Sequence, residues 1–300
     1  MKKEIFEKIV EKKDFSQLPR KDVETAFSHF EKRQVSDMEK IRLTRELLHK
    51  VFGAFGSKKL LSLKDKEPEW ILKKHLSTRE RFPFYKEVYG RIFSSIVNLD
   101  RARRLVSQPH PTPQPPTLKS PRYPPQKLQG NEITVFDLGA GVNGFSYDFI
   151  SNALTRHKAP TTRSKLSYIA VEAVGQWVKL MDYYFKTRGI GARAIHESLF
   201  EIDKVKKYLK QVKGKKIVFL FKTLDSLEMM QRDYSKKLIS EIVLLADRVV
   251  VSFATQSMVK RKRFGARRSW IVNFLEKEFK IFDDFSFGGE RYIVFGKNKD

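Results

Sequence analysis

The chain has 300 residues, with 60 Lys and Arg against 35 Asp and Glu, which gives a formal net charge of +25 at pH 7. Apolar residues make up 41% and Cys is absent, which excludes wholesale disorder, a disulfide framework, a thiolate zinc site and a cysteine nucleophile. Apolar runs fall short of the roughly 18 residues that span a bilayer, and acidic residues interrupt any signal-peptide core near the start. We therefore expect a cytoplasmic protein that does not associate with membranes.

The positive charge predicts a polyanionic partner, and nucleic acid is the first candidate. The excess is spread over the chain: residues 1–105 carry 26 basic and 16 acidic side chains, and residues 131–300 carry 31 and 19. A Lys- and Glu-rich surface of the thermophile type is the competing interpretation. Such a surface interleaves both signs and need not depart so far from neutrality.

Residues 1–105 carry a helical pattern. Apolar side chains within 23–30 recur at i, i+3, i+4 and i+7, and Ser36 with Glu39 forms a capping box ahead of a second apolar run. A further helix is expected over 84–105. The pattern predicts an all-helical N-terminal module.

Residues 106–130 are predicted to be a linker, because eight of the twelve prolines lie between Pro109 and Pro125. Proline at this density prevents a helix interior or a central strand and favours extended chain. A ligand for a proline-recognition domain is the competing interpretation.

Residues 131–300 change to short runs of Val, Ile and Phe separated by stretches long enough for helices, which is typical of an α/β domain with a mostly parallel sheet. The runs 280–285 and 291–295 predict a closing hairpin. The other strands are predicted at 133–137, 167–172, 216–221 and 247–253, with one more ending near His196.

A glycine-rich turn follows the first of these strands and is the most informative motif. Gly139, Gly141 and Gly144 let the backbone turn tightly and approach a ligand, ahead of a helix that presents its N-terminal amides. The spacing also fits a dinucleotide fingerprint. Asp137, however, puts a carboxylate where a pyrophosphate would lie, and Glu172 follows the second glycine by 31 residues rather than about 20.

The turn with its two acids therefore resembles the S-adenosylmethionine site of Rossmann-like methyltransferases. Glu172 can accept hydrogen bonds from both ribose hydroxyls. Dinucleotide binding and a structural turn without a ligand are the alternatives. The fourth strand is not followed by the Asn/Asp-Pro-Pro-aromatic tetrad of many exocyclic-amine methyltransferases, which argues against methylation of an amino group.

Residues at the following strand ends complete the predicted site. Ser198 and Leu199 are the candidates for contact with adenine, and Glu197 is the alternative. Lys222 follows the fourth strand and Ser252 lies near the end of the fifth, and both are expected to face the target. The cofactor-binding set is Arg81, Asp137, Gly139, Ala140, Gly141, Glu172, Ser198, Leu199 and Lys222.

A basic segment follows the fifth strand, on the side of the sheet where ligands bind. It contains no acid, and Phe264 or Trp270 could stack on a base. A solvated charge run is the competing interpretation. The predicted RNA-binding residues are Lys260, Arg261, Lys262, Arg263, Arg267 and Arg268.

Four stretches resemble one family in matching order: 75–82 with the pattern H-x-S-T-x-E-R, 137–144, 222–228 and 252–257. They look like the small-subunit (16S) ribosomal RNA guanine-N7 methyltransferases, which include the aminoglycoside-resistance enzymes. The resemblance implies a Rossmann-like methyltransferase domain over 131–300 behind a helical domain over 1–105 that docks on the ribosomal subunit. It also implies an arginine at the cofactor carboxylate, here Arg81, with Arg79 as the alternative.

The chain departs from that family in three places. The proline-rich segment has no counterpart, Ala254 stands where Pro is usual, and Met258–Arg268 is more basic than the family's Gly-Gly-rich loop. These departures bear on the identity of the target base.

The chemistry at guanine N7 requires little from the protein beyond positioning, because the lone pair is nucleophilic at neutral pH and carries no proton. We therefore expect no general base and no metal, and the six histidines are scattered along the chain. The sequence predicts a monomeric S-adenosylmethionine-dependent methyltransferase acting on ribosomal RNA or the small subunit. The alternatives are a methyltransferase for tRNA or another rRNA position and a non-catalytic ribosome-assembly factor.

Overall fold

The structure is a computed structural model. It describes residues 1–53, 66–106, 132–156, 166–255 and 268–298, and the side chains of 97–106 are not included in that description. Nearly all of the predicted linker and most of the basic segment, 260–267, lie outside these residues.

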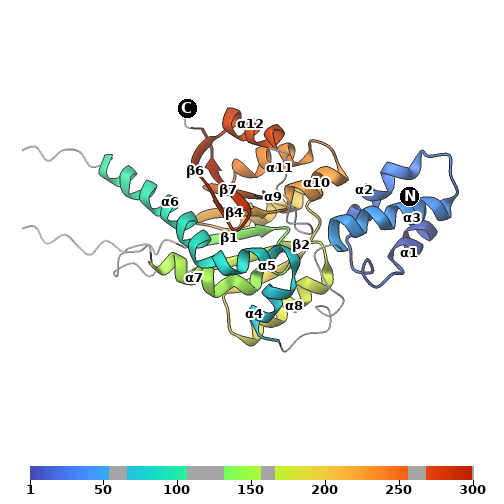
Figure 1. Cartoon of the computed structure of the whole chain (residues 1–300), viewed down its shortest axis with the longest axis horizontal. Coiled ribbons are helices and arrows are strands. Elements are labelled where there is room, and N and C mark those ends of the chain that lie inside the picture. Colours follow the sequence, from blue (N-terminus) through green and yellow to red (C-terminus); the bar gives the residue numbers. More distant parts are fainter. Residues whose placement is uncertain (54–65, 107–131, 157–165, 256–267, 299–300) are drawn as a thin grey trace, which may run out of the picture.

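The first helices form a bundle of their own at one end of the molecule (Figure 1). It consists of α1 (Lys3–Val10), α2 (Arg20–Glu31), α3 (Asp37–Leu48) and the π-helical turn η1 (His49–Gly53). The predicted capping box is partly present, because the Ser36 hydroxyl accepts the Glu39 N–H at 3.2 Å. Ile9, Val23 and Leu48 are fully buried between the helices, so this bundle has a core. We call these residues, 1–53, the N-terminal bundle.

The next helices pack on the sheet domain. They are α4 (Pro68–Lys74), α5 (Leu76–Arg81), the 3₁₀ turn η3 (Phe82–Phe84) and α6 (Tyr85–Val106). Helix α6 confirms the helix expected over 84–105, and it contacts α7 and β6. Its buried face carries Tyr85, Tyr89 and Phe93.

The sheet has seven strands in the order β3-β2-β1-β4-β5-β7-β6. Strands β1 to β5 are parallel, and β7 is antiparallel to both β5 and β6. This confirms the predicted α/β class and the closing hairpin. The strands are β1 (Ile133–Leu138), β2 (Leu166–Glu172), β3 (Ala192–His196), β4 (Lys215–Phe221), β5 (Arg248–Ala254), β6 (Lys280–Phe287) and β7 (Glu290–Gly296).

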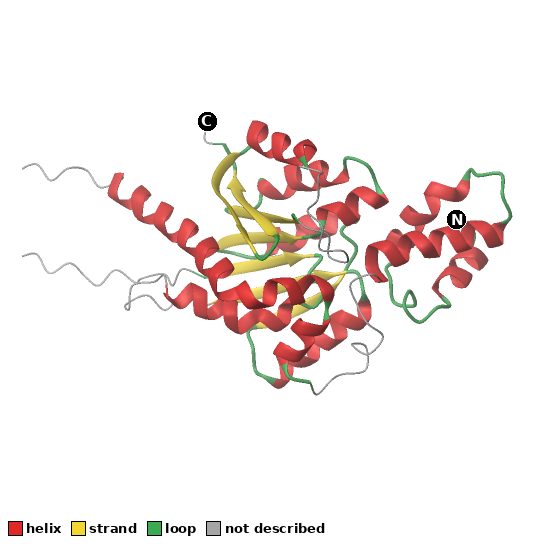
Figure 2. Ribbon diagram, in the orientation of Figure 1, coloured by secondary structure: helices red, strands yellow, loops and turns green. Residues whose placement is uncertain are grey.

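Helices cover both faces of the sheet (Figure 2). Helices α5 and α6 lie on one face with α7 (Tyr147–Arg156) and α8 (Gly175–Thr187), and the short turn η4 (Asn143–Ser146) leads into α7. The other face carries α9 (Ile202–Gln211), α10 (Leu224–Met230), α11 (Tyr234–Val243) and α12 (Ser269–Glu278). The strand order reverses between β1 and β4, and open α/β sheets bind ligands at the carboxyl ends of such strands. None of the described helices is both long and apolar enough to cross a membrane.

Candidate functional site

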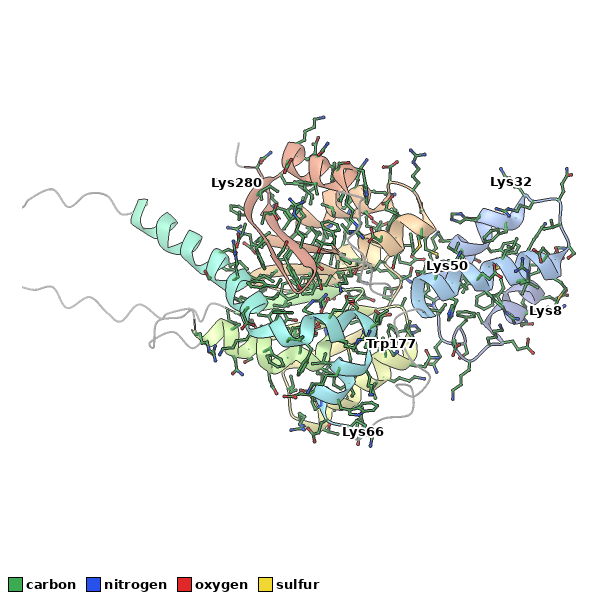
Figure 3. All side chains as sticks on the ribbon, in the orientation of Figure 1. Lys8, Lys32, Lys50, Lys66, Trp177 and Lys280 are labelled. Carbon is green, nitrogen blue, oxygen red and sulfur yellow. The ribbon has the colours of Figure 1, made fainter. Side chains whose placement is uncertain are left out.

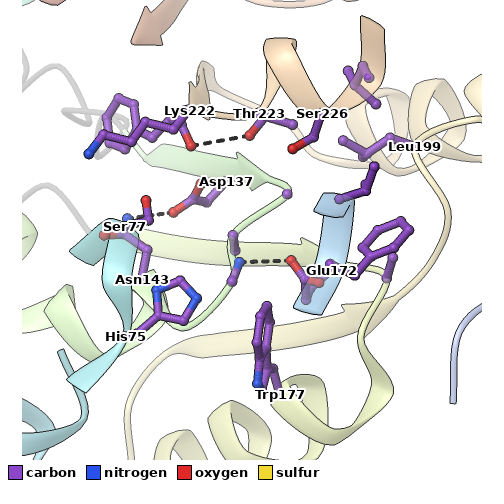
Figure 4. Close-up of a pocket in the computed structure, with 18 of the residues that line it drawn as sticks. His75, Ser77, Asp137, Asn143, Glu172, Trp177, Leu199, Lys222, Thr223 and Ser226 are labelled. Atoms are coloured by element: carbon purple, nitrogen blue, oxygen red, sulfur yellow. Dashed lines mark hydrogen bonds between the residues drawn. The ribbon is translucent and has the colours of Figure 1, made fainter. Parts of the chain in front are cut away.

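A pocket lies at the carboxyl ends of β1, β2 and β4. The helix α5 closes one side of it, and the N-terminal bundle contributes three residues, Asp22, Val51 and Phe52. Most of the predicted cofactor-binding residues meet here (Figure 4). Those that line it are Arg81, Asp137, Gly139, Ala140, Gly141, Glu172, Leu199 and Lys222.

The glycine-rich turn forms the floor of the pocket, and two of its positions require glycine. Gly139 has φ +72°, and a Cβ there would lie 2.7 Å from a side-chain carbon of Thr223. Gly141 has φ +57°, and a Cβ would lie 3.1 Å from the His75 ring. Both backbones occupy a region that L side chains rarely adopt. Thr223 and His75 therefore pack directly against the backbone of the turn.

Asp137 is buried near the end of β1 and accepts two hydrogen bonds. The Tyr168 hydroxyl and the Asn143 side-chain amide each donate to Oδ2 at 2.7 Å. Burial raises the pKa of Asp137, and the two hydrogen bonds and the charge of Arg81 oppose that rise. Both hydrogen bonds end on Oδ2, so the carboxylate retains capacity for a cationic ligand in the pocket.

Glu172 ends β2, and two backbone amides fix its carboxylate. Gly141 N–H donates to Oε2 and Val174 N–H donates to Oε1, each at 2.8 Å. Burial nevertheless raises the pKa of Glu172 to about 7. Each carboxylate oxygen has further lone pairs, so the group can still accept hydrogen bonds from vicinal hydroxyls.

Arg81 lies at the end of α5 and is buried in a network of charges. Its guanidinium pairs with Glu290 at 2.7 Å and donates to the Asn143 side-chain oxygen at 3.3 Å and to the Tyr292 hydroxyl at 3.2 Å. The alternative, Arg79, is exposed and does not line the pocket. Of the two arginines, Arg81 is the one that the fold brings to the site.

Lys222 follows β4 in a left-handed conformation, with φ +56°, which is unusual for a residue other than glycine. Its ammonium pairs with Glu80 at 2.6 Å and Glu290 at 3.3 Å. Ser252 is buried beside it, where its hydroxyl contacts Glu290 and accepts the Lys222 N–H at 3.1 Å. Lys222 lines the pocket and Ser252 does not.

The strand β3 ends at His196 as predicted, but the pocket-lining residues after it lie one position further along the chain than the predicted pair. Leu199 lines the pocket, as does Phe200, whereas Ser198 and Glu197 are buried but do not line it. The Ser198 hydroxyl accepts the Phe200 N–H at 3.1 Å and so stabilises the turn that exposes the two apolar side chains.

Of the predicted RNA-binding residues, the structure describes only Arg268. Its guanidinium forms two hydrogen bonds with the Asp225 carboxylate, at 3.0 and 2.6 Å, and its side chain is 13% exposed. Arg268 therefore holds the start of α12 against α10 rather than projecting into solvent. Trp270, a candidate for base stacking, is partly buried against the core.

Several residues of the pocket were not predicted from the sequence. Trp177 packs edge-on against His75, with ring centroids 5.0 Å apart, and its buried Nε1 has no hydrogen-bond partner among the described residues. Glu290 neutralises Arg81 from β7. Asp22 could have been found from the sequence as a buried acid, because it lies on the buried face of α2 beside Val23 and Ala26.

These features fit S-adenosylmethionine. Asp137 on β1, Glu172 at the end of β2 and Leu199 after β3 follow one another along neighbouring strands, and Arg81 also lines the pocket. Two buried polar atoms, Trp177 Nε1 and Asp22 Oδ2, lack partners among the described residues. The same residues include no group of three or more His, Asp or Glu that could hold a metal ion, and the expected absence of a metal stays a prediction.

Solved structures of 16S rRNA methylases share this fold over nearly the whole chain. The structure is similar to the 16S rRNA methyltransferase RmtF in complex with S-adenosyl-L-homocysteine, with 17% identity, a TM-score of 0.66 and coverage of 99% of this chain and 100% of that one. It is similar to the 16S rRNA methylase RmtB, with 18% identity, a TM-score of 0.65 and 98% of each chain covered. An rRNA methylase from Escherichia coli gives 18% identity, a TM-score of 0.63 and coverage of 98% and 99%.

No protein-family model and no curated protein matches the chain by sequence. At these identities the structural likeness establishes the fold, and it confirms the predicted resemblance at that level. The likeness includes the helices before the sheet, because it covers both chains almost completely.

Proposed function

We propose that the protein is an S-adenosylmethionine-dependent methyltransferase of small-subunit ribosomal RNA that modifies guanine N7. The observation that carries the proposal is the pocket at the switch point of the sheet, where Arg81, Asp137 and Glu172 converge on the glycine-rich turn. The likeness in fold to 16S rRNA methylases supports the choice of substrate class.

The cofactor is oriented by the order of charges along the pocket. Asp137 would hold the ammonium of the methionine end, and Arg81 would hold its carboxylate. Glu172 would accept the ribose hydroxyls, and the apolar side chains of Leu199 and Phe200 would pack against adenine. The cofactor supplies an electrophilic methyl group on a sulfonium.

The protein's own part in methyl transfer is to position the target base. Guanine N7 attacks with a lone pair that carries no proton, so no group in the pocket has to act as a general base. His75 is buried beneath the glycine-rich turn, and burial together with Arg81 and Lys222 lowers its pKa to about 3. It therefore stays neutral and supports Gly141 by packing.

Binding of RNA would use positive charge on two parts of the chain. Lys8, Lys32 and Lys50 are exposed on the N-terminal bundle (Figure 3). The basic segment follows β5, whose carboxyl end lies on the pocket side of the sheet because β4 and β5 are parallel. We propose that the bundle docks on the subunit and that Lys260, Arg261, Lys262, Arg263 and Arg267 contact phosphates near the target base.

The test is incubation with radiolabelled S-adenosylmethionine and, in parallel, purified small subunits, large subunits and bulk tRNA. We expect label in 16S rRNA from small subunits alone. Label in tRNA alone would refute the ribosomal assignment, and label in none of the three would favour the non-catalytic assembly factor. A variant with Asp137→Ala is the matched negative control.

Borohydride and aniline treatment of the labelled RNA then tests the target atom, because this chemistry cleaves at 7-methylguanine. We expect one new cleavage site, visible by primer extension. Methylated RNA that resists cleavage would keep the methyltransferase assignment and overturn the N7 assignment.

A further inference from the structure

Asp22 is a buried acid that the N-terminal bundle inserts into the pocket of the sheet domain. It lies in the first turn of α2, is 2% exposed, and lines the pocket together with Val51 and Phe52 of η1. It belongs to neither the glycine-rich turn nor any strand end. Its presence in this pocket therefore needs a separate explanation.

The carboxylate of Asp22 faces the side chain of Ser198, and its Oδ2 is buried with no partner among the described residues. Burial and the nearby Glu172 and Glu197 raise the pKa of Asp22 to about 7. A buried polar atom without a partner is costly, so an acid kept in this position implies a donor that arrives from elsewhere.

The bundle is anchored on both sides of the pocket, which fixes where Asp22 lies. On the side of α8, Gly175 N–H donates to the Gln17 carbonyl at 3.2 Å, and the Gln176 side chain donates to the Lys13 carbonyl at 3.0 Å. On the side of α10, a ring nitrogen of His29 lies 2.6 Å from the Met230 carbonyl oxygen. The bundle thus spans the pocket.

The place of Asp22 in the pocket selects the part of the ligand that it would meet. Ser198, which Asp22 faces, follows β3, one strand further toward the sheet edge than the proposed ribose-binding position at Glu172. A base attached to that ribose would extend toward Leu199 and Phe200. Adenine carries an exocyclic amine, a donor that matches an unpaired carboxylate oxygen.

We infer that Asp22 is a cofactor-binding residue that accepts a hydrogen bond from the exocyclic amine of adenine, so that the N-terminal bundle forms one wall of the cofactor pocket. This inference rests on the proposed function, because it assumes an adenosyl cofactor. It follows that the bundle helps to select adenine over other bases, and that cofactor binding strengthens its attachment to the sheet domain by linkage.

The test is calorimetric titration of the full chain at pH 8 with S-adenosylhomocysteine and with S-inosylhomocysteine, in which a carbonyl replaces the exocyclic amine. The wild-type protein should prefer the adenosyl compound by about 10- to 100-fold, the range of one hydrogen bond to a charged group. Asp22→Ala should weaken binding of the adenosyl compound by a similar factor, and it should reduce the preference for the adenosyl over the inosyl compound to a few-fold. Asp22→Asn, which can donate to the inosyl carbonyl, should bind the inosyl compound more tightly than Asp22→Ala does.

The matched control is Glu24→Gln, an acid on the same helix that pairs with Arg20 at 2.8 Å on the surface. It should leave both affinities unchanged. An equal loss for both compounds in Asp22→Ala would overturn the assignment to the amine, and unchanged binding of both would overturn the role of Asp22 altogether. If the wild-type protein binds neither compound, the proposed function and this inference fall together. If the wild-type protein binds S-adenosylhomocysteine and Asp22→Ala binds it equally tightly, the proposed function stands and this inference alone is wrong.

Discussion

Arg81 and Glu290 form a buried ion pair at 2.7 Å, although 209 positions separate them in the chain. The pair joins α5, ahead of the sheet, to β7, the antiparallel strand near its edge. Glu290 also pairs with Lys222 and contacts Ser252, so one carboxylate neutralises two buried cations beside the pocket. The charges of Arg81 and Lys222 hold the pKa of Glu290 below its ordinary value.

Replacing Glu290 should therefore destabilise the protein strongly. Glu290→Gln leaves the buried Arg81 guanidinium without its counter-charge, and breaking a buried pair from one side costs about 3–5 kcal/mol of unfolding free energy. Urea denaturation monitored by circular dichroism measures this. The control is Glu69→Gln, which breaks the exposed pair with Lys73 and should cost less than about 1 kcal/mol. Equal losses in the two variants would contradict the structural role assigned to Glu290.

Asp137→Ala should abolish detectable binding of S-adenosylhomocysteine, a loss of about 100-fold or more, because it removes the acceptor proposed for the ammonium. Calorimetry with wild type and variant gives the two dissociation constants. The companion variant Tyr168→Phe keeps the carboxylate and removes one of its two donors. It should cost at most about tenfold in affinity, and a loss as large as that of Asp137→Ala would point to a structural rather than a direct role.

The parts of the site that could be predicted from the sequence are those whose residues lie close together in the chain or end successive strands. Asp137, Gly139 and Gly141 lie within five positions, and Glu172 ends the next strand, so local pattern and strand order sufficed. After β3 the pocket is lined by the predicted Leu199 and by Phe200 instead of the predicted Ser198, because the residues that follow a strand cannot be placed exactly from periodicity alone.

Two residues take their places only through tertiary packing. Asp22 enters the pocket from a separate bundle, and Glu290 pairs with Arg81 beside the pocket from the closing hairpin. The sequence contains no signal for either placement. Arg268 belongs to a basic run that reads as solvent-exposed, yet the fold pairs it with Asp225. Charge composition therefore does not predict the role of an individual arginine.

The stability of the cofactor-free protein should depend on the ionisation of Asp22. Because the folded-state pKa is about 7, above the ordinary value of 3.8, protonation favours the folded state. That contribution is complete below about pH 4 and is lost as the pH rises through 7, at up to about 1.4 kcal/mol per unit. The groups that face Asp22 are the carboxylates of Glu172 and Glu197, the Ser198 hydroxyl and the Tyr234 phenol.

Asp22→Asn removes this titration. The unfolding free energy of the variant minus that of wild type should therefore become more positive between pH 5 and pH 8 in the absence of cofactor. Thermal denaturation at several pH values measures the difference, and Glu24→Gln serves as the surface control. A difference that stays constant over this range would show that Asp22 does not carry the raised pKa.

Neutralising the basic segment should separate binding of RNA from binding of the cofactor. A variant with Lys260, Arg261, Lys262 and Arg263 all changed to Gln should lower methyl transfer to small subunits and leave the affinity for S-adenosylhomocysteine unchanged. If each cation contacts a phosphate, the slope of log affinity against log salt should become shallower by about 3, because each contact contributes about 0.7 on a single strand. Arg268 is left in place, since its loss would release Asp225 and disturb α12. An unchanged salt slope in this variant would refute phosphate contact by the segment.

A matched variant changes Lys8 and Lys32 on the N-terminal bundle to Gln. It should weaken subunit binding without altering the affinity for the cofactor.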